Sequence, residues 1–306
     1  MNLLTPDLIK TIYNSPRELK LFLEQNSLGM RKKFGQNFLI NPSIREKLLD
    51  ALELKPMDKV WEIGPGLGAM TLGLLKRSAE VTAFEIDIGF IKILKELFAS
   101  NSNFKLIEGD VLKTWPKTPK HIDTILFGNL PYNIAAILLA DMIEKKSFFK
   151  KIVITVQLET AQRLLAKPGA KDYSSLTVLC SSVYNIRPLI KIKGSSFYPI
   201  PKVESQGLRL DLIKDKDELP MYFNTLTRAL FASRRKTIKN NLYNFVNSVI
   251  LKNTNKESKQ CAQSAQIIVL KALESMNISA NIRAETLGTG DFIRLAQILE
   301  DLIEND

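Results

Sequence analysis

Apolar residues along the first two-thirds of the chain follow two alternating spacings. Short runs rich in branched and aromatic residues predict β-strands at residues 59–63, 81–85, 104–107, 122–127 and 152–156. Apolar residues at helical spacing predict helices between them, at residues 72–76, 90–98, 134–143 and 159–165. Such alternation predicts right-handed crossovers and a mostly parallel sheet with helices on both faces. We therefore expect an α/β fold whose ligand lies beyond the carboxyl ends of the strands.

The two ends of the chain have other patterns. Residues 1–33 form a basic lead-in that predicts one or two short helices, and Asn41-Pro42 marks the start of a further helix. After Pro201, an extended segment at 207–213 and a charged break precede helical stretches at residues 221–231, 236–249, 265–276 and 292–303, with a polar loop at 252–259. We expect three parts: the lead-in at 1–33, the α/β domain at 34–213 and a small all-α domain at 214–306.

Composition and charge narrow the range of partners. The 306 residues are 45% hydrophobic and 25% charged, which is typical of globular proteins. With 43 Lys and Arg against 32 Asp and Glu, the net charge of +11 attracts polyanions, so nucleic acid or an acidic membrane surface is favoured. Residues 219–256 carry no acid and seven bases, a pattern that on its own usually marks a solvated face: Arg228, Arg234, Arg235, Lys236, Lys239, Lys252 and Lys256.

Several classes of chemistry are disfavoured. Cys180 and Cys261 are far apart and form no C-x-x-C pair, which argues against a disulfide framework and a zinc site. The single histidine, His121, is expected to be an ordinary surface residue, which disfavours a histidine base or a histidine metal cluster. No apolar run approaches the ~18 residues of a membrane span, and the first residues lack a signal-peptide pattern. We expect a cytoplasmic protein with no metal and no membrane partner.

A glycine-rich turn and three acids mark the candidate ligand site. The first strand runs into residues 62–68 (E-I-G-P-G-L-G), where glycines let a ligand approach the backbone, a feature shared with dinucleotide-binding enzymes. Besides Glu62, Glu85 ends the second strand, where it can accept from ribose hydroxyls, and Asp110 follows the third, where it can accept from an adenine amino group. These acids suit a nucleoside without phosphates, such as S-adenosylmethionine, and would repel a pyrophosphate.

The end of the fourth strand is the most specific signal. It reads Asn129-Leu130-Pro131-Tyr132. The lone pair of an adenine N6 is delocalised into the ring, and acceptors on its two N–H groups help to localise it toward a methyl donor. The Asn129 side-chain oxygen and the Leu130 carbonyl can be those acceptors, while Pro131 fixes the turn and Tyr132 can stack on the base. The plain alternative is a turn that only ends the strand.

The order of these motifs resembles that of the rRNA adenine N6,N6-dimethyltransferases. The chain is most similar to the small-subunit branch of that family, which confers kasugamycin sensitivity. The resemblance covers nearly everything from Arg31 onward except about residues 250–277. The motifs that carry it lie at residues 31–39, 62–68, 85–87, 109–110, 129–132 and 197–203, with two more in the helical part at 231–236 and 283–287.

The resemblance implies roles that spacing alone does not give. In the family fold, a Rossmann-like methyltransferase sheet with an added helical domain, the methionine end of the cofactor lies against Asn37, Leu39 and Gly64. Glu85 holds the ribose and Asp110 the adenine. These assignments are implied by the resemblance, and each falls on a residue that matches the family's motif.

The same resemblance assigns the target side of the site. Asn129 is implied to touch both cofactor and target, and Phe197 to stack on the flipped adenine opposite Tyr132. In the helical part, three consecutive bases become candidates for rRNA contact: Arg234, Arg235 and Lys236.

Departures from the family pattern are mild. Trp61 stands where a smaller aliphatic residue is usual, residues 88–90 replace a commonly charged stretch, and the lead-in is longer than a minimal start. None of them falls on a residue to which the resemblance assigns a contact.

The implied function is transfer of two methyl groups from S-adenosylmethionine to N6 of each of two adjacent adenines in the 3′-terminal hairpin loop of 16S rRNA. The implied partner is small-subunit rRNA within an immature 30S subunit. One alternative is the large-subunit (23S) branch of the macrolide-resistance type, against which the long helical domain argues. Another is a non-catalytic small-subunit assembly factor, and a dinucleotide oxidoreductase is a distant third.

Overall fold

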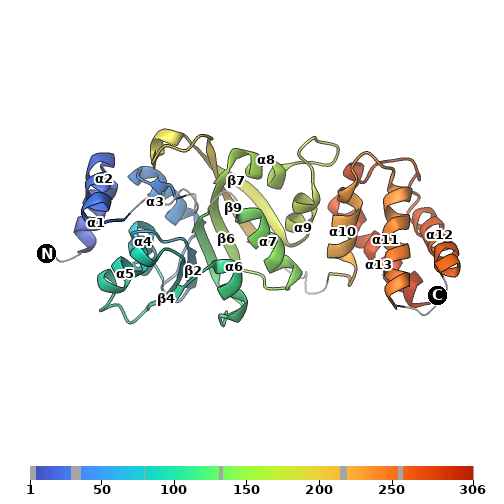
Figure 1. The fold of residues 1–306 in the computed structure, drawn as a ribbon, viewed down its shortest axis with the longest axis horizontal. Helices are drawn as coiled ribbons and strands as arrows, with labels where there is room; N and C mark the ends of the chain where they lie inside the picture. Colours follow the sequence, from blue (N-terminus) through green and yellow to red (C-terminus); the bar gives the residue numbers. More distant parts are fainter. Residues whose placement is uncertain are drawn as a thin grey trace. The chain divides into compact units, whose positions relative to one another are not determined.

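The chain folds into two compact units (Figure 1). The computed structural model describes residues 5–28, 36–78, 80–130, 134–213, 219–253 and 258–305. The first unit comprises Met1–Ala161 and Asn185–Leu212, and we call it the α/β unit. The second comprises Gln162–Tyr184 and Ile213–Asp306, and we call it the helical unit. Residues 162–184 therefore group with the helical unit, although strands of the sheet follow them in sequence.

Among the described residues, seven strands form one sheet. They are β2 (Lys59–Ile63), β3 (Glu80–Glu85), β4 (Phe104–Glu108), β5 (Ile125–Asn129), β6 (Lys151–Gln157), β7 (Tyr184–Ile192) and β9 (Ser205–Leu212). Their order is β4-β3-β2-β5-β6-β9-β7, in which the first five are mutually parallel and β9 is antiparallel to β6. The expected α/β fold with a mostly parallel sheet is confirmed. The strand order reverses between β2 and β5, the position at which such sheets bind ligands.

A second, two-stranded sheet was not expected from the sequence. It pairs β1 (Phe38–Leu39) antiparallel to β8 (Phe197–Tyr198), with Leu39 opposite Phe197. The pairing joins two segments that are distant in sequence, and both contribute residues to the site described below. The strand expected at 122–127 is wrong at its start: residues 122–124 lie outside the strand, with Ile122 83% exposed, and β5 instead extends to Asn129.

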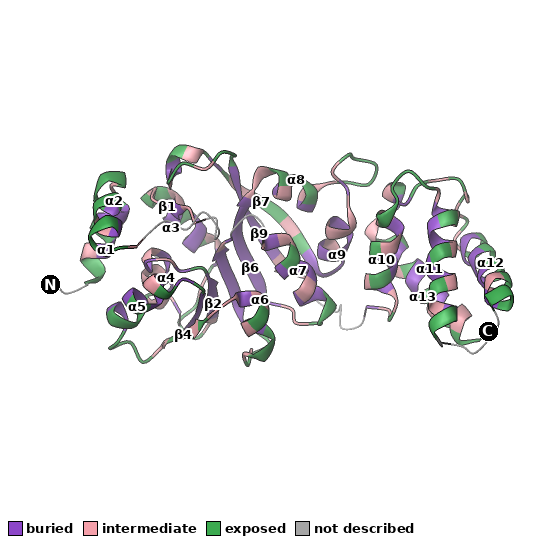
Figure 2. Cartoon of the chain, in the orientation of Figure 1, coloured by how far each residue is buried: buried purple, intermediate pink, exposed green. Residues whose placement is uncertain are grey.

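Helices lie against the sheet, and most residues of its central strands are buried (Figure 2). The first eight helices of the described residues are α1 (Pro6–Tyr13), α2 (Pro16–Gln25), α3 (Pro42–Ala51), α4 (Ala69–Leu75), α5 (Ile88–Leu97), α6 (Val111–Thr114), α7 (Ala135–Glu144) and α8 (Leu158–Leu165), and the residues of α8 from Gln162 onward belong to the helical unit. Leu48 of α3 and Leu74 of α4 lie in one core cluster with Val60 of β2. Trp61, the next residue, points to the opposite face, where its ring lies 4.8 Å from that of Phe84. The bulky residue is thus accommodated in the core.

The lead-in, for which the pattern predicts one or two short helices, forms two. The side chains of Thr5 and Ser15 accept from backbone N–H groups in the first turns of α1 and α2, and a proline follows each cap. Ile9 and Leu19 are fully buried, in a cluster that also contains Phe90 of α5. The lead-in therefore contributes to the core of the α/β unit.

The helical unit contains α9 (Ser175–Val183), α10 (Phe223–Ala232), α11 (Ile238–Asn253), α12 (Ser258–Ser275) and α13 (Thr289–Glu304). The four helices expected here are confirmed, whereas α9 was not expected. The loop expected at 252–259 is wrong at both ends, because α11 continues to Asn253 and α12 begins at Ser258. Phe231 stacks on Phe292 with ring centroids 5.7 Å apart, and Phe292 is fully buried. The unit thus has its own hydrophobic core.

Candidate cofactor and target site

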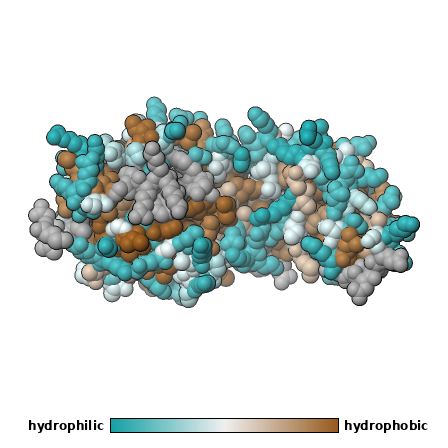
Figure 3. Space-filling view, in the orientation of Figure 1, coloured by the Kyte–Doolittle hydropathy of each residue, from teal (hydrophilic) through white to brown (hydrophobic). Residues whose placement is uncertain are grey.

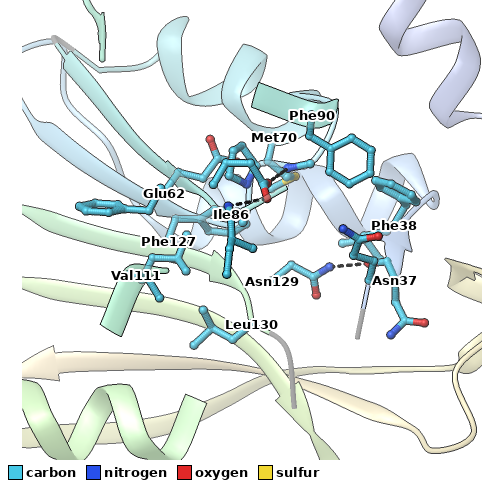
Figure 4. A pocket seen from close by; sticks show the side chains of 18 of the residues that line it. Asn37, Phe38, Glu62, Met70, Ile86, Phe90, Val111, Phe127, Asn129 and Leu130 are labelled. Atoms are coloured by element: carbon cyan, nitrogen blue, oxygen red, sulfur yellow. Dashed lines mark hydrogen bonds between the residues drawn. The ribbon is translucent and has the colours of Figure 1, made fainter. Parts of the chain in front are cut away.

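A pocket opens at the carboxyl ends of β2, β3 and β5, where the strand order reverses (Figure 4). Its walls come from segments spread over the whole α/β unit. Among the residues singled out from the sequence, those that line it are Asn37, Leu39, Glu62, Gly64, Glu85, Asp110, Asn129, Leu130 and Phe197. The structure thus brings these residues together. Pro131 and Tyr132 lie outside the described residues, as do residues 31–35 of the first motif.

The glycine turn leaves room on the pocket side. Gly64 and Gly66 have φ values of +70° and +58°, which L-residues with a side chain rarely adopt. No atom lies within 4 Å of where a Cβ on Gly64 would stand, so the backbone is open to a ligand there. At Gly66 a Cβ would lie 3.0 Å from the Phe38 ring and 3.4 Å from the Tyr13 hydroxyl. One glycine therefore faces the open pocket, and the other is packed from behind.

Glu85 is fixed at the end of β3 by backbone donors. Its Oε1 accepts from the N–H groups of Ile86 and Asp87 at 2.8 and 2.9 Å, and its Oε2 accepts from Gly66 at 3.2 Å. The side chain is 5% exposed, and burial, which outweighs these hydrogen bonds, raises its pKa to about 7. A pair of ribose hydroxyls would supply donors to this carboxylate. The arrangement fits the role expected for Glu85.

Glu62 is the more deeply buried carboxyl of the pocket. It is 1% exposed, and the Thr71 hydroxyl of α4 donates to its Oε2 at 2.6 Å. Burial is the main cause that raises its pKa to about 8, and the nearby Glu85 adds to the rise. A site with two perturbed carboxyls at strand ends is typical of a functional pocket. Such a pocket attracts a cation or a hydrogen-bond donor.

Asp110 begins α6 and lies at the pocket edge. Its Oδ1 accepts from the N–H of Leu112 at 3.0 Å, which fixes the carboxylate as the helix cap. The side chain is half-buried and lines the pocket. The position is compatible with acceptance from an adenine amino group, the role expected for Asp110.

The Asn129 amide is held on both sides. Its Nδ2 donates to the Asn37 carbonyl at 2.9 Å (Figure 4), and its Oδ1 accepts from the Thr155 hydroxyl of β6. Because a carbonyl oxygen can only accept, the Asn37 contact settles which end of the amide is nitrogen. The amide oxygen retains a second lone pair. The side chain is therefore oriented before any ligand binds.

Phe197 belongs both to the hydrophobic core and to the pocket lining. It is 2% exposed and belongs to the core cluster that contains Leu39 and Ile192, while it also lines the pocket. One part of the ring thus supports the fold and another part borders the pocket. The stacking role expected for it remains a prediction.

Tyr13 is a pocket residue that the sequence did not reveal. It lies at the end of α1, is 4% exposed and lines the pocket. Its hydroxyl accepts from the N–H of Leu67 at 3.3 Å, and its ring meets Phe38 edge-on. A buried tyrosine in an amphipathic helix is ordinarily a core residue, so no signal in the sequence distinguished it.

The three consecutive bases of the helical unit, Arg234, Arg235 and Lys236, differ in their contacts. Arg234 donates to Glu285 Oε2 at 2.7 Å and to the Lys171 carbonyl at 2.9 Å. Arg235 and Lys236 are exposed. The visible surface of the helical unit is largely hydrophilic (Figure 3). Arg234 is exposed as well, but its guanidinium is hydrogen-bonded within the helical unit.

The described residues contain neither a candidate metal site nor a candidate membrane-spanning helix. The parts of the chain that the structure describes contain no group of three His, Cys, Asp or Glu residues that could hold a metal ion. Within the same parts, no helix is both long and apolar enough to cross a membrane. His121 is exposed, as expected, with its Nε2 2.6 Å from Lys59 Nζ, and does not line the pocket.

Comparison with known proteins identifies the family. The model of the ribosomal RNA adenine dimethylase family matches residues 28–284. The chain belongs to this family. It is 44% identical to a ribosomal RNA small subunit methyltransferase A from Treponema denticola, over 95% of this chain and 96% of the relative. It is 48% identical to a protein of the same name from Borreliella afzelii, over 78% of this chain and 85% of the relative.

A solved structure gives the same result. A dimethyladenosine transferase from Plasmodium falciparum superposes with a TM-score of 0.70 and 28% identity, covering 83% of this chain and 94% of the other. The expected family and methyltransferase fold are confirmed. The family match and the relatives therefore identify the chain as an rRNA adenine dimethyltransferase whose cofactor is S-adenosylmethionine. The pocket fits this cofactor in two respects: the backbone at Gly64 is open to a ligand, and the Glu85 carboxylate is placed where it can accept from hydroxyl groups.

Proposed function

We propose that this protein transfers methyl groups to N6 of two adjacent adenines in the 3′-terminal hairpin loop of 16S rRNA, giving N6,N6-dimethyladenosines. The observation that carries the proposal is the Asn129 amide, oriented at the end of β5 in the same pocket as the glycine turn and Glu85. The names of the curated relatives, which specify the small subunit, support 16S rRNA over 23S rRNA. We further propose that the enzyme acts on immature 30S subunits in the cytoplasm, with a role in their biogenesis.

The chemistry requires positioning rather than a strong base. S-adenosylmethionine supplies an electrophilic methyl group on its sulfonium sulfur. The Asn129 Oδ1 and the Leu130 carbonyl accept from the two N–H groups of the target amine, which directs the nitrogen lone pair along the remaining direction. Holding the reacting atoms in line converts a bimolecular displacement into an effectively unimolecular step. The protein's contribution is therefore geometric and electrostatic.

Proton removal needs no dedicated residue in this scheme. The methylated amine is cationic and acidic enough to release its proton to water. Glu62 and Glu85 lie on the cofactor side, where their contacts are to Thr71 and to backbone N–H groups.

The target adenine must leave its stack to reach the pocket, which costs a few kcal/mol. We assign Tyr132 and Phe197 to the stacking that offsets part of this cost.

Isotope-labelled cofactor tests the proposal directly. The protein is incubated with labelled S-adenosylmethionine and with small subunits from cells that lack the modification, and the rRNA is mapped by mass spectrometry. We expect dimethyladenosine at two adjacent positions of the 3′-terminal hairpin loop, and no label with Asn129→Ala. Large subunits are treated in parallel. Label in 23S rRNA alone, or binding of small subunits without any methylation, would contradict the proposal.

A further inference from the structure

Thr155 contacts both residues that are proposed to hold the target amine. It lies on β6 directly opposite Asn129 of β5 in the parallel pairing. Its hydroxyl donates to Asn129 Oδ1, and its carbonyl accepts from the N–H of Leu130 at 3.2 Å. Thr155 is 1% exposed. Its side chain is thus buried behind the pocket and contacts the pocket residue Asn129, while its backbone contacts Leu130.

We propose that Thr155 is a positioning residue for methyl transfer. Its hydroxyl sets the direction in which Asn129 Oδ1 presents its remaining lone pair to the target amine. The inference rests on the function proposed above, since it assigns Thr155 a part in the orientation of the Asn129 acceptor. Thr155 itself touches neither the cofactor nor the base.

The hydroxyl restricts what Asn129 can accept. An amide oxygen has two lone pairs, and the Thr155 hydroxyl uses one of them. One acceptor direction remains, which matches one N–H of the amine, while the Leu130 carbonyl is available for the other. Asn129 Nδ2 donates to the Asn37 carbonyl at the same time. The amide therefore lies between a donor and an acceptor, an arrangement in which each hydrogen bond strengthens the next.

The surroundings of Thr155 argue against a purely structural role. The residues of β6 from Ile152 to Val156 are otherwise Ile or Val, and all are buried. Valine has nearly the same shape as threonine and suits a buried strand at least as well. A buried hydroxyl in such a strand costs free energy unless it is hydrogen-bonded. Here the hydroxyl is bonded to the amide that faces the pocket, so its presence is explained by Asn129 rather than by packing.

Two pairs of variants at Thr155 separate the effect of its hydroxyl from that of its methyl group. Thr155→Val removes only the hydroxyl and keeps the shape, whereas Thr155→Ser keeps the hydroxyl and loses the methyl group. Thr155→Ala with Thr155→Ser makes the same comparison without the methyl group, so the test survives if Thr155→Val does not fold. Thr82→Val, at a buried threonine of β3 that does not line the pocket, is the control for loss of a buried hydroxyl in the sheet.

Single-turnover methyl transfer is measured with saturating cofactor and under-methylated small subunits. We expect the rate to fall about tenfold in Thr155→Val, which corresponds to about 1.4 kcal/mol of lost transition-state stabilisation. Thr155→Ser should retain most of the rate, and the affinities for cofactor and subunits should stay within about twofold. A normal rate in Thr155→Val, or equal slowing in Thr155→Ser, would overturn the inference. So would slowing that matches the loss of cofactor affinity.

A measurement without catalysis separates this inference from the proposed function. In protein labelled with 15N-asparagine, the side-chain amide resonances of Asn129 should shift and exchange faster with solvent in Thr155→Val, but not in Thr82→Val. Unchanged Asn129 resonances would overturn the inference. If the wild-type protein does not methylate small subunits, the proposed function fails. If the wild type and Thr155→Val methylate equally, only the assignment of Thr155 fails.

Discussion

The Tyr13 hydroxyl accepts from the backbone N–H of Leu67 at 3.3 Å, which joins α1 to the glycine turn 54 residues away. The guanidinium of Arg45 lies 5.5 Å from the centre of the Tyr13 ring and donates to Asn14 Oδ1 at 2.8 Å. Arg45 also donates to the carbonyls of Leu39 and Ile40. Helix α1 is thus tied by hydrogen bonds to the glycine turn directly and to the Leu39 and Ile40 backbone through Arg45.

The first prediction concerns this contact. Tyr13→Phe removes the acceptor of the Leu67 N–H while keeping the ring against Phe38, and a lost hydrogen bond of this kind costs about 1 kcal/mol. We expect S-adenosylmethionine to bind about fivefold more weakly, measured by calorimetry. Tyr173→Phe is the matched control, because it removes a buried tyrosine hydroxyl that donates to the Leu287 carbonyl in the helical unit. Unchanged cofactor affinity together with a lowered melting temperature would show that Tyr13 only stabilises the fold.

The second prediction is a pH dependence of cofactor affinity. Burial raises the pKa of Glu85 to about 7 from an ordinary value of 4.5. Ribose hydroxyls donate to the ionised carboxylate, so binding favours the form that is lost as the pH falls below 7. We expect the affinity to weaken about tenfold between pH 8 and pH 6 because the ionised fraction falls by that factor. Glu85→Gln should bind more weakly, with a flatter profile over the same range, and an equally steep profile in the variant would contradict the assignment.

The third prediction is that Glu62 and Glu85 give the stability of the cofactor-free protein the opposite dependence on pH. Because the pKa values of Glu62 and Glu85 in the folded protein lie above the ordinary value, the folded state binds protons more tightly than the unfolded state. Their favourable contribution is present below about pH 4.5 and is lost as the pH rises through about 7 and 8. Thermal unfolding of the cofactor-free protein should therefore show a smaller decrease in melting temperature between about pH 6 and pH 9 in Glu62→Gln than in the wild type. An unchanged decrease would show that Glu62 is already ionised at the lower pH.

Much of the site could be predicted because parallel strands end at one edge of a sheet. Glu85, Asp110 and Asn129 each stand at or just after the end of a strand, so recognition of the strands was enough to group them. Tyr13 and Thr155 could not be found in this way. Tyr13 reaches the turn from a separate helix, and the role of Thr155 depends on its register with Asn129. Neither relationship leaves a local pattern in the sequence.

The elements that were missed have sequences that weaken the usual signals. β7 contains Pro188, which cannot donate to a ladder, and it lies last in the strand order, where proline is tolerated. α9 is rich in Ser, Thr, Val and Cys, which have low helix propensity, and most of its residues are buried. Its helix is therefore favoured by tertiary packing rather than by local preference. In both segments the element forms because of tertiary packing, and the local sequence alone does not predict it.

The fourth prediction separates the three bases of the helical unit. Replacing Arg235 and Lys236 with Ala should weaken rRNA binding and reduce the slope of log affinity against log salt by about 0.7 for each phosphate contact on single-stranded RNA. Arg234→Ala should change the slope much less, because its guanidinium is engaged by Glu285 and the Lys171 carbonyl. Fluorescence anisotropy over a range of salt concentrations measures the rRNA affinity and its salt slope for each variant. Lys105→Ala, on β4, is the control. A slope lowered most by Arg234→Ala would assign the RNA contact to Arg234 instead.

The fifth prediction tests stacking at Phe197 without removing its part in the core. Phe197→Ala would leave a cavity among Leu39 and Ile192 and cost about 3–5 kcal/mol of stability, so a lowered rate in that variant would be ambiguous. Phe197→Leu keeps most of the volume but not the aromatic face. Loss of base stacking is worth about 1–3 kcal/mol, so we expect at least about a fivefold lower single-turnover rate at unchanged cofactor affinity. Phe149→Leu, at a fully buried aromatic residue that does not line the pocket, controls for repacking. If the two variants lose the same rate in proportion to their lowered melting temperatures, Phe197 supports the pocket wall and does not stack on the target.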